Sequence, residues 1–265
     1  ENDYKTMDID FMESVWWVFK ELWEKDLIYQ DYKVLPYSWA ASTPLSNFEA
    51  NMDYRDVEDP SIYFTLNARA DFNNVQKGDK FLVWTTTPWC IPGNLAIAIG
   101  KDINYSRVSI NDEFYWIATQ RLQELEEFEI EIISSCNGTE LIGSSYIPAY
   151  SEYENLYSDG AFRLIHSDDT NTDSGSGLVS QAPAYGESDF YALKNSGIDV
   201  IADPVTLSGK FDNTFKELEG LNVKDAAYIE LEKDGKTFWG VGIHPNTTRA
   251  SFDSIIVGLS KLITS

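Results

Sequence analysis

Hydrophobic and polar positions follow two different periods along the chain, and these periods predict where helices and strands lie. Residues 8–30 carry apolar side chains at three- and four-residue spacing, including Val15, Phe19 and Leu22, which predicts an amphipathic helix that packs through one face. From residue 60 onward the apolar runs become short and are separated by turn residues, as is typical of strands. We expect strands at residues 61–66, 80–84, 94–100, 105–110, 113–119, 129–134 and 162–166, and a short acidic helix at 120–128.

Many short strands with few helices predict an α+β fold, in which a β-barrel-like domain is decorated with helices. Near the C-terminus, two alternating runs flank Asp234-Gly235, a pair that favours a hairpin turn, and a helix through 255–262 should follow. The predicted fold therefore ends in a C-terminal β-hairpin and helix. We divide the chain into an N-terminal helical segment (1–49), a β-barrel domain (50–225) and a hairpin-helix appendage (226–265).

Composition indicates a folded globule with an unusual charge. The 265 residues are 43% hydrophobic, and they include 20 basic and 43 acidic side chains for a net charge of -23. Such a chain should repel nucleic acid at long range unless a local basic patch exists. No apolar run approaches the ~18 residues of a membrane span, and no signal peptide opens the chain, so we expect a cytoplasmic protein without membrane contact.

The few cysteines and histidines leave little material for a metal or redox site. Cys90 and Cys136 support neither a disulfide framework nor a zinc site, and His166 and His244 lie far apart in sequence. We therefore expect no metal and no cofactor.

Three successive threonines, Thr85, Thr86 and Thr87, follow a strand-like run. They cannot all fill a core, because an unpaired buried hydroxyl costs ~1–3 kcal/mol. Pro88 and Pro92 remove two backbone donors just beyond them. Two interpretations stay open from the residues alone: a turn with its threonines in water, or a strand end whose hydroxyls face a cavity.

Residues 84–94 resemble the threonine-rich peptide of the editing domain inserted into isoleucyl-tRNA synthetases. Valyl and leucyl relatives usually carry an Arg after the threonines, so Thr87-Pro88-Trp89 points to the isoleucyl branch. Residues 175–189 resemble the other active-site strand and loop of that domain. Residues 1–49 resemble the segment that leads into the insertion in eukaryotic-type enzymes. The β-barrel fold of the insertion agrees with the strand pattern.

This resemblance implies an ester hydrolase that removes valine from misacylated tRNA(Ile), with the 3′ end of aminoacyl-tRNA as its partner. It implies that Asp189 binds the α-ammonium of the amino acid, whereas the alternative for Asp189 is a helix N-cap. It further implies that Thr85, Thr86 and Thr87 line the pocket and help to place water. The remaining implied roles are a pocket wall for Trp89, a contact with the terminal nucleotide for Asn94, and close approach of the adenosine at Gly175 and Gly177.

Ser180 departs from the family pattern, which has a His nine residues before the Asp. Imidazole offers bulk and a donor or acceptor at each ring nitrogen, whereas serine offers one short hydroxyl. We expect Ser180 to enlarge the substrate pocket. Lower activity on the valyl ester, looser rejection of isoleucine, and loss of hydrolysis all remain open.

The end of the chain departs from the family. Residues 239–243 and 250–251 are similar to the C-terminal end of the regulatory domain of 2-isopropylmalate synthases, which suggests a fusion. About forty residues are too few for a core of their own, so we expect this appendage to pack on the barrel or to make a homo-oligomer contact.

Two hypotheses follow from these observations. The leading one is an isoleucyl-tRNA synthetase-like editing domain that hydrolyses Val-tRNA(Ile); it lacks aminoacylation activity because neither ATP-handling motif of the synthetase occurs in the chain. The rival is a catalytically weakened derivative with a binding, regulatory or toxin-like role, as Ser180, the acidic charge and the appendage suggest. A basic cleft around Asp189 would favour the enzyme, and an acidic rim would favour the derivative.

Overall fold

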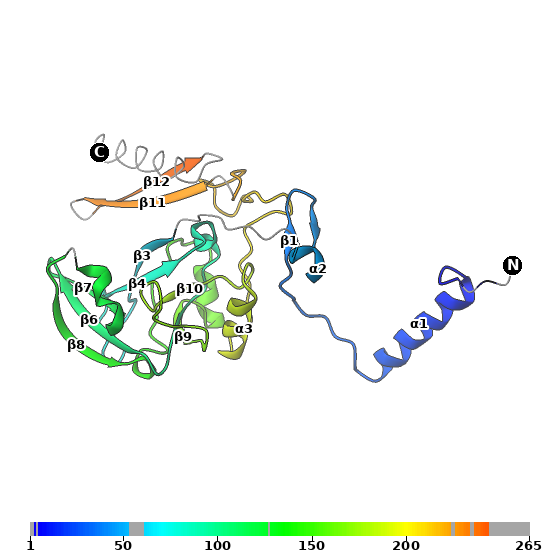
Figure 1. Ribbon diagram of the computed structural model, residues 1–265, viewed down its shortest axis with the longest axis horizontal. Helices are drawn as coiled ribbons and strands as arrows, with labels where there is room; N and C mark the ends of the chain where they lie inside the picture. The colour runs from blue at the N-terminus through cyan, green and yellow to red at the C-terminus, as the bar shows by residue number, and fades with distance from the viewer. Residues whose placement is uncertain are drawn as a thin grey trace. The chain divides into compact units, whose positions relative to one another are not determined.

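The computed structural model in Figure 1 describes Asp3 and residues 5–52, 61–126, 128–223, 226–233 and 236–243. The chain forms two compact units, residues 1–33 and 34–265. The larger unit contains a curled sheet with short helical turns. The elements are α1 (Ile9–Glu24), β1 (Tyr37–Ser38), β2 (Thr43–Pro44), α2 (Asn47–Ala50), β3 (Ile62–Asn67), β4 (Lys80–Thr85), η1 (Pro88–Gly93), β5 (Ala96–Ile99), β6 (Asn104–Ile110), β7 (Glu113–Ala118), η2 (Thr119–Leu125), β8 (Glu131–Asn137), η3 (Gly138–Glu140), η4 (Glu154–Asp159), β9 (Arg163–His166), β10 (Val179–Gln181), α3 (Glu187–Asn195), β11 (Ala226–Lys233) and β12 (Lys236–Ile243).

The first unit contains the predicted N-terminal helix in a shorter form. α1 ends at Glu24, because Asp26 takes a positive φ of 53°, a left-handed conformation that cannot continue the helix. No residue of α1 is buried by the described part of the chain. Trp16 and Trp23 are 69% and 61% exposed. The apolar face predicted for this helix is therefore present, and the packing of that face stays a prediction.

The sheet of the second unit curls into a nearly closed barrel, so the predicted α+β, barrel-like fold is confirmed. Its strands follow the order β8-β6-β7-β4-β10-β5-β9, and β3 pairs with the other edge of β4. Two isolated bridges then lead from β9 back to the end of β3: Arg163 with Ser145, and Tyr146 with Ala68. Strands β6, β7 and β8 extend the sheet beyond this ring. The short helix expected at 120–128 is the 3-10 helix η2.

The barrel interior is filled by alternating strand residues, as the period of two predicts. β4 buries Phe81, Val83 and Thr85 and leaves the side chains between them partly exposed. β5 is buried at every position, as expected of a strand covered on both faces. The largest fully buried side chains are Trp116, Tyr105, Tyr146, Phe81, Phe162, Phe211 and Phe215.

The predicted C-terminal hairpin is confirmed at the level of the backbone. β11 and β12 pair antiparallel from Ala226 with Ile243 to Lys233 with Lys236, and β11 approaches η1. The turn at 234–235 and the helix expected through 255–262 lie outside the described residues. The division of the chain at residues 49 and 225 stays a prediction. None of the helices in the described part of the chain combines the length and the apolar character needed to cross a bilayer.

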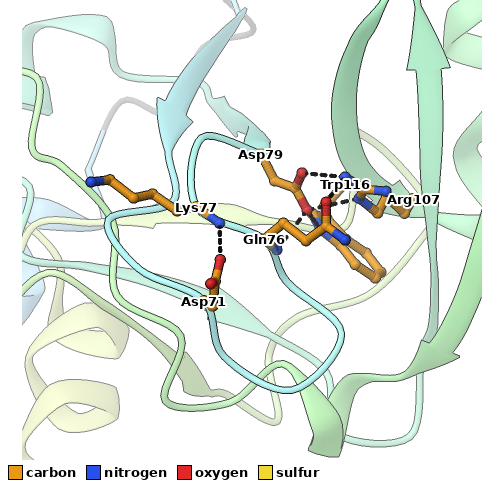
Figure 2. A network of polar contacts seen from close by, with 6 residues as sticks. All are labelled: Asp71, Gln76, Lys77, Asp79, Arg107 and Trp116. Carbon is orange, nitrogen blue, oxygen red and sulfur yellow. Dashed lines mark hydrogen bonds and ion pairs between the residues drawn. The ribbon is translucent and has the colours of Figure 1, made fainter.

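A buried ion pair holds the loop before β4 against the sheet (Figure 2). Asp79 accepts hydrogen bonds from the Nε and Nη2 of Arg107 at 2.8 and 2.7 Å, from Trp116 Nε1 at 3.0 Å and from the backbone N–H of Gln76 at 3.0 Å. The Arg107 guanidinium also lies 3.9 Å from the Phe114 ring centroid. Because both charges are buried and each has several partners, removing one would leave the other uncompensated.

We predict that Arg107→Met lowers the free energy of unfolding by about 3–5 kcal/mol, because the buried Asp79 carboxyl would lose its charged partner. The matched control is Glu113→Gln, which breaks the more exposed Lys80–Glu113 pair and should cost no more than about 1 kcal/mol. Urea unfolding monitored by tryptophan fluorescence measures both values. Equal losses in the two variants would contradict the role assigned to the buried pair.

Candidate functional site

The two peptides singled out in the sequence lie side by side because β10 is inserted between β4 and β5. Val179 pairs with Trp84 of β4 in parallel, and Ser180 pairs with Ile97 of β5 in antiparallel register. The backbone N–H of Trp84 donates to Leu178 O at 2.9 Å. The threonine peptide leaves the end of β4, and the loop to α3 leaves the end of β10, so both emerge at one edge of the barrel.

The three threonines have different environments. Thr85 is buried at the end of β4, whereas Thr86 and Thr87 are exposed. The Thr85 hydroxyl accepts a hydrogen bond from the backbone N–H of Thr87 at 3.1 Å, and the two hydroxyl oxygens lie 3.4 Å apart. The residues therefore form a tight hydroxyl-lined turn at a strand end, with Thr86 and Thr87 open to solvent.

Cys90 belongs to this turn, although the sequence analysis did not single it out. Its thiol donates to Thr87 O at 2.8 Å and lies 3.1 Å from Thr87 Oγ1. Burial raises the pKa of the Cys90 thiol, and the nearby charge of Asp189 raises it further. The sequence signal was its place three residues after Thr87, within the 3-10 turn between Pro88 and Pro92.

Asp189 lies in the first turn of α3, where Gly186 is the N-cap, so the N-cap interpretation of Asp189 is wrong. Its Oδ2 accepts the backbone N–H of Ala182 at 2.8 Å, and Ser188 Oγ donates to its Oδ1 at 3.4 Å. Burial raises the pKa of this carboxyl. The bond to Ala182, the residue that directly follows β10, places the carboxylate at the end of the strand that pairs with β4.

Asn94 and Ser180 are buried and bonded to each other rather than open to a ligand. Asn94 Nδ2 donates to Ser180 Oγ and to Ala96 O, both at 2.9 Å, and Asn94 Oδ1 accepts from Tyr146 OH at 2.6 Å. These bonds tie Asn94 to β10, and the predicted contact of Asn94 with the terminal nucleotide stays a prediction. Ser180 lines neither of the two cavities described below, and the enlarged substrate pocket expected at Ser180 stays a prediction.

Gly175 and Gly177 are required by internal packing. Both have positive φ values, and an added Cβ would lie 2.5 Å from the Trp84 ring at Gly175 and 2.4 Å from Ala118 Cβ at Gly177. Their carbonyls accept hydrogen bonds from Arg121 Nε and Tyr105 OH, each at 2.8 Å. The close approach expected for an adenosine is thus already made by protein side chains.

Trp89 lines a cavity that the threonines and Asp189 do not line, so its implied role as a wall of the substrate pocket stays a prediction. Its ring packs against Tyr185 with centroids 4.8 Å apart, and both rings line a cavity of about 440 Å³. A second cavity, of about 520 Å³, lies along one side of α3, from Glu187 to Asn195. We call the carboxylates that line it, Asp168, Asp169 and Glu187, the acidic rim. The described residues contain no cluster of three His, Cys, Asp or Glu side chains that could hold a metal ion.

The comparison with protein families gives one match over most of the chain. The family described as tRNA synthetases class I (I, L, M and V) matches residues 1–246. The match continues past residue 225, where we placed the end of the barrel domain.

Among curated relatives, isoleucine–tRNA ligase of Bdellovibrio bacteriovorus is 42% identical over 247 residues, which cover 90% of this chain and 23% of the relative. The corresponding ligase of Protochlamydia amoebophila is 41% identical over 227 residues, 84% of this chain and 21% of the relative. The ligase of Tetrahymena thermophila is 38% identical over 234 residues, which cover 85% of this chain and 21% of the relative. The chain spans less than a quarter of the length of these relatives.

Solved structures with some likeness include a crystal structure titled GlLeuRS-CP1, at 17% identity and a TM-score of 0.45, covering 56% of this chain and 74% of that one. The editing domain of P. falciparum cytosolic leucyl-tRNA synthetase is 10% identical with a TM-score of 0.39, covering 51% and 65%. At these scores the likeness carries no conclusion about this chain.

Replacement of Asp189 by Asn should stabilise the fold at neutral pH, by a few degrees in melting temperature. The pKa of Asp189 is raised in the folded state, so the native state holds its proton more tightly than the unfolded state. Stability linked to this carboxyl is therefore greatest below its ordinary pKa and falls as the pH rises through the folded pKa. Asn keeps the acceptor for Ala182 and removes the charge.

Melting curves from pH 3 to 8 measure this effect, and Asp159→Asn serves as a control at an exposed site. The advantage of Asp189→Asn over the parent should shrink below about pH 4, where both side chains are neutral. An advantage that is independent of pH would contradict the electrostatic explanation.

Proposed function

The chain belongs to the class I tRNA synthetase family, with isoleucine–tRNA ligases among its relatives, and we propose that it is an editing domain that hydrolyses misacylated Val-tRNA(Ile). The isoleucyl relation expected from residues 84–94 is confirmed by this membership. The observation that carries the proposal is that the Thr85–Thr87 hydroxyl turn and the loop that leads to Asp189 leave two paired parallel strands at the same edge of the barrel, where Asp189 Oδ2 accepts the backbone N–H of Ala182 directly after β10.

The substrate class explains why such a site is needed. Valine lacks one methylene of isoleucine, and one methylene gives only ~1–3 kcal/mol of discrimination between the two amino acids. Isoleucyl-tRNA synthetase is the standard example of that limit. A separate hydrolytic site removes the error. An ester to a ribose hydroxyl is already activated, so holding the ester and a water molecule in the right geometry supplies much of the catalysis.

In this proposal Asp189 binds the α-ammonium of the valyl group through a charge-assisted hydrogen bond. The exposed hydroxyls of Thr86 and Thr87 orient the ester and the attacking water. Cys90 is a positioning residue, since its thiol holds the backbone and hydroxyl of Thr87. Water is the nucleophile, because burial raises the pKa of the thiol and its proton is donated to Thr87 O, which together suppress the thiolate.

The remainder of a synthetase would supply what this chain lacks. The net charge of -23 opposes binding of a polyanion, and the chain spans less than a quarter of its relatives. We therefore propose that the chain contacts the tRNA only through its 3′ end. We further propose that it does not aminoacylate tRNA and that it acts in the cytoplasm. A homo-oligomer contact through the appendage stays a prediction.

Deacylation of Val-tRNA(Ile) by the 265-residue chain tests this function. We expect release of valine above the spontaneous rate, and a loss of about 100-fold or more in Asp189→Ala, because the substrate would lose its ammonium anchor. Cys90→Ser should retain most of the activity, since a hydroxyl can replace the bond to Thr87 O. Turnover in Asp189→Ala equal to the parent would overturn the proposal.

The acidic rim favours a second candidate, a weakened derivative that binds without hydrolysing. Asp168, Asp169 and Glu187 lie beside α3 and would repel the phosphates of a bound strand. Calorimetry with an adenosine that carries valine through an amide instead of an ester separates the two. Binding of this analogue by a chain that shows no deacylation favours the derivative.

A further inference from the structure

An aromatic cavity next to the candidate site has no part in the proposed hydrolysis. Its volume of about 440 Å³ lies within the range of small-molecule sites. Its aromatic rings come from three separate segments: Tyr37 and Trp39 around β1, Trp89 in η1 and Tyr185 before α3. Thr85, Thr86, Thr87 and Asp189 are not among the residues that line it.

The aromatic rings are held in place by packing and hydrogen bonds. Trp89 and Tyr185 pack at 4.8 Å with an interplanar angle of 60°. Trp39 lies against Gly209, where an added Cβ would be 3.0 Å from Trp39 Cβ. Gly209 has a positive φ of 72°, so both its conformation and this contact favour glycine. The walls of the cavity are thus built by the fold.

One carboxylate lies among these rings. Asp203 Oδ1 accepts hydrogen bonds from Tyr185 OH at 3.1 Å and from the backbone N–H of Val205 at 3.3 Å. Burial raises the pKa of Tyr185, and the Asp203 charge raises it further, so the phenol stays neutral and donates. Both contacts use Oδ1, and Asp203 is exposed on the surface of the cavity, so Oδ2 is free of these two bonds.

The groups that line the cavity give it a negative electrostatic potential. Aromatic faces are negative, and they attract cations within about 6 Å of the ring centroid. Asp203 adds a full negative charge, and neither Lys nor Arg is among the described residues that line the cavity. The net charge of -23 acts in the same direction. Aromatic rings combined with a carboxylate are the chemistry that recognises alkylated ammonium groups.

We propose that this cavity binds an organic cation, an alkylammonium group whose charge is met by Asp203 and by the faces of Trp39, Trp89 and Tyr185. This site is independent of the proposed deacylation, since its chemistry is complete without Asp189 and the threonines. Trp89 adjoins Cys90 in η1, so an occupied cavity would restrain the turn that carries the threonine hydroxyls.

Choline and its neutral isostere 3,3-dimethyl-1-butanol are the probes, because they have the same shape and differ in charge. Tryptophan fluorescence and line broadening of the probe's methyl signal measure binding to the whole chain. We expect choline to bind about tenfold more tightly than the isostere, and its affinity to fall as the salt concentration rises. Equal affinities, or no binding of choline at tens of millimolar, would overturn the proposal.

Asp203→Asn removes the charge and keeps the acceptor for Tyr185 and Val205, so the fold should be retained. It should weaken choline binding about tenfold and leave the isostere unchanged. Asp159→Asn, which removes one carboxylate outside the cavity, should leave choline binding unchanged. An unaltered choline affinity in Asp203→Asn would contradict the assigned carboxylate.

Trp39→Leu tests the aromatic wall, and its melting temperature shows whether the variant is folded. A folded variant with unchanged choline affinity would overturn the cation–π contribution. Adenosine and spermidine test for other kinds of ligand. Tighter binding of adenosine than of choline would mean that the cavity is a nucleobase site. Equal binding of spermidine by the parent and by Asp203→Asn would mean that cations are attracted only to the acidic surface. Either outcome contradicts the proposal.

Discussion

The insertion of β10 between β4 and β5 is the interaction on which the arrangement of this molecule depends. Only three residues, Val179–Gln181, make the pairing, yet they join segments almost a hundred positions apart. The side chains at 94 and 180 add a buried hydrogen bond to the same junction. Without this junction, the threonine turn and the Asp189 helix would belong to separate parts of the sheet.

Around that junction the protein uses polar groups in two ways. Some are satisfied internally and fix the backbone, such as Asn94 with its three bonds and Asp79 with Arg107. Others lie on exposed residues, such as the hydroxyl of Thr86. A buried polar group without partners is costly, so the satisfied groups form the frame and the open ones are available for chemistry.

The sequence predicted the strands well because their signal is local. Residues 80–85 form a short run whose alternate side chains are buried, and residues 105–110 form a second short run that is buried at every position except Ser109. The partners of Asp79, Asn94 and Gly177 could not be predicted, since each is made by residues far along the chain. For the same reason the sequence did not reveal that Gly175 and Gly177 pack against Trp84 and Ala118. The helix predicted over residues 8–30 ends earlier, at Glu24, because Asp26 adopts a left-handed conformation.

The buried hydrogen bond between Asn94 and Ser180 limits which side chains position 180 can hold. A serine there fits a space already closed by Tyr146 and Asn94. An imidazole is larger by several atoms, and an interior packed to this density resists such an increase. A larger side chain at 180 therefore requires a smaller neighbour, so the residues at 94, 146 and 180 constrain one another's size.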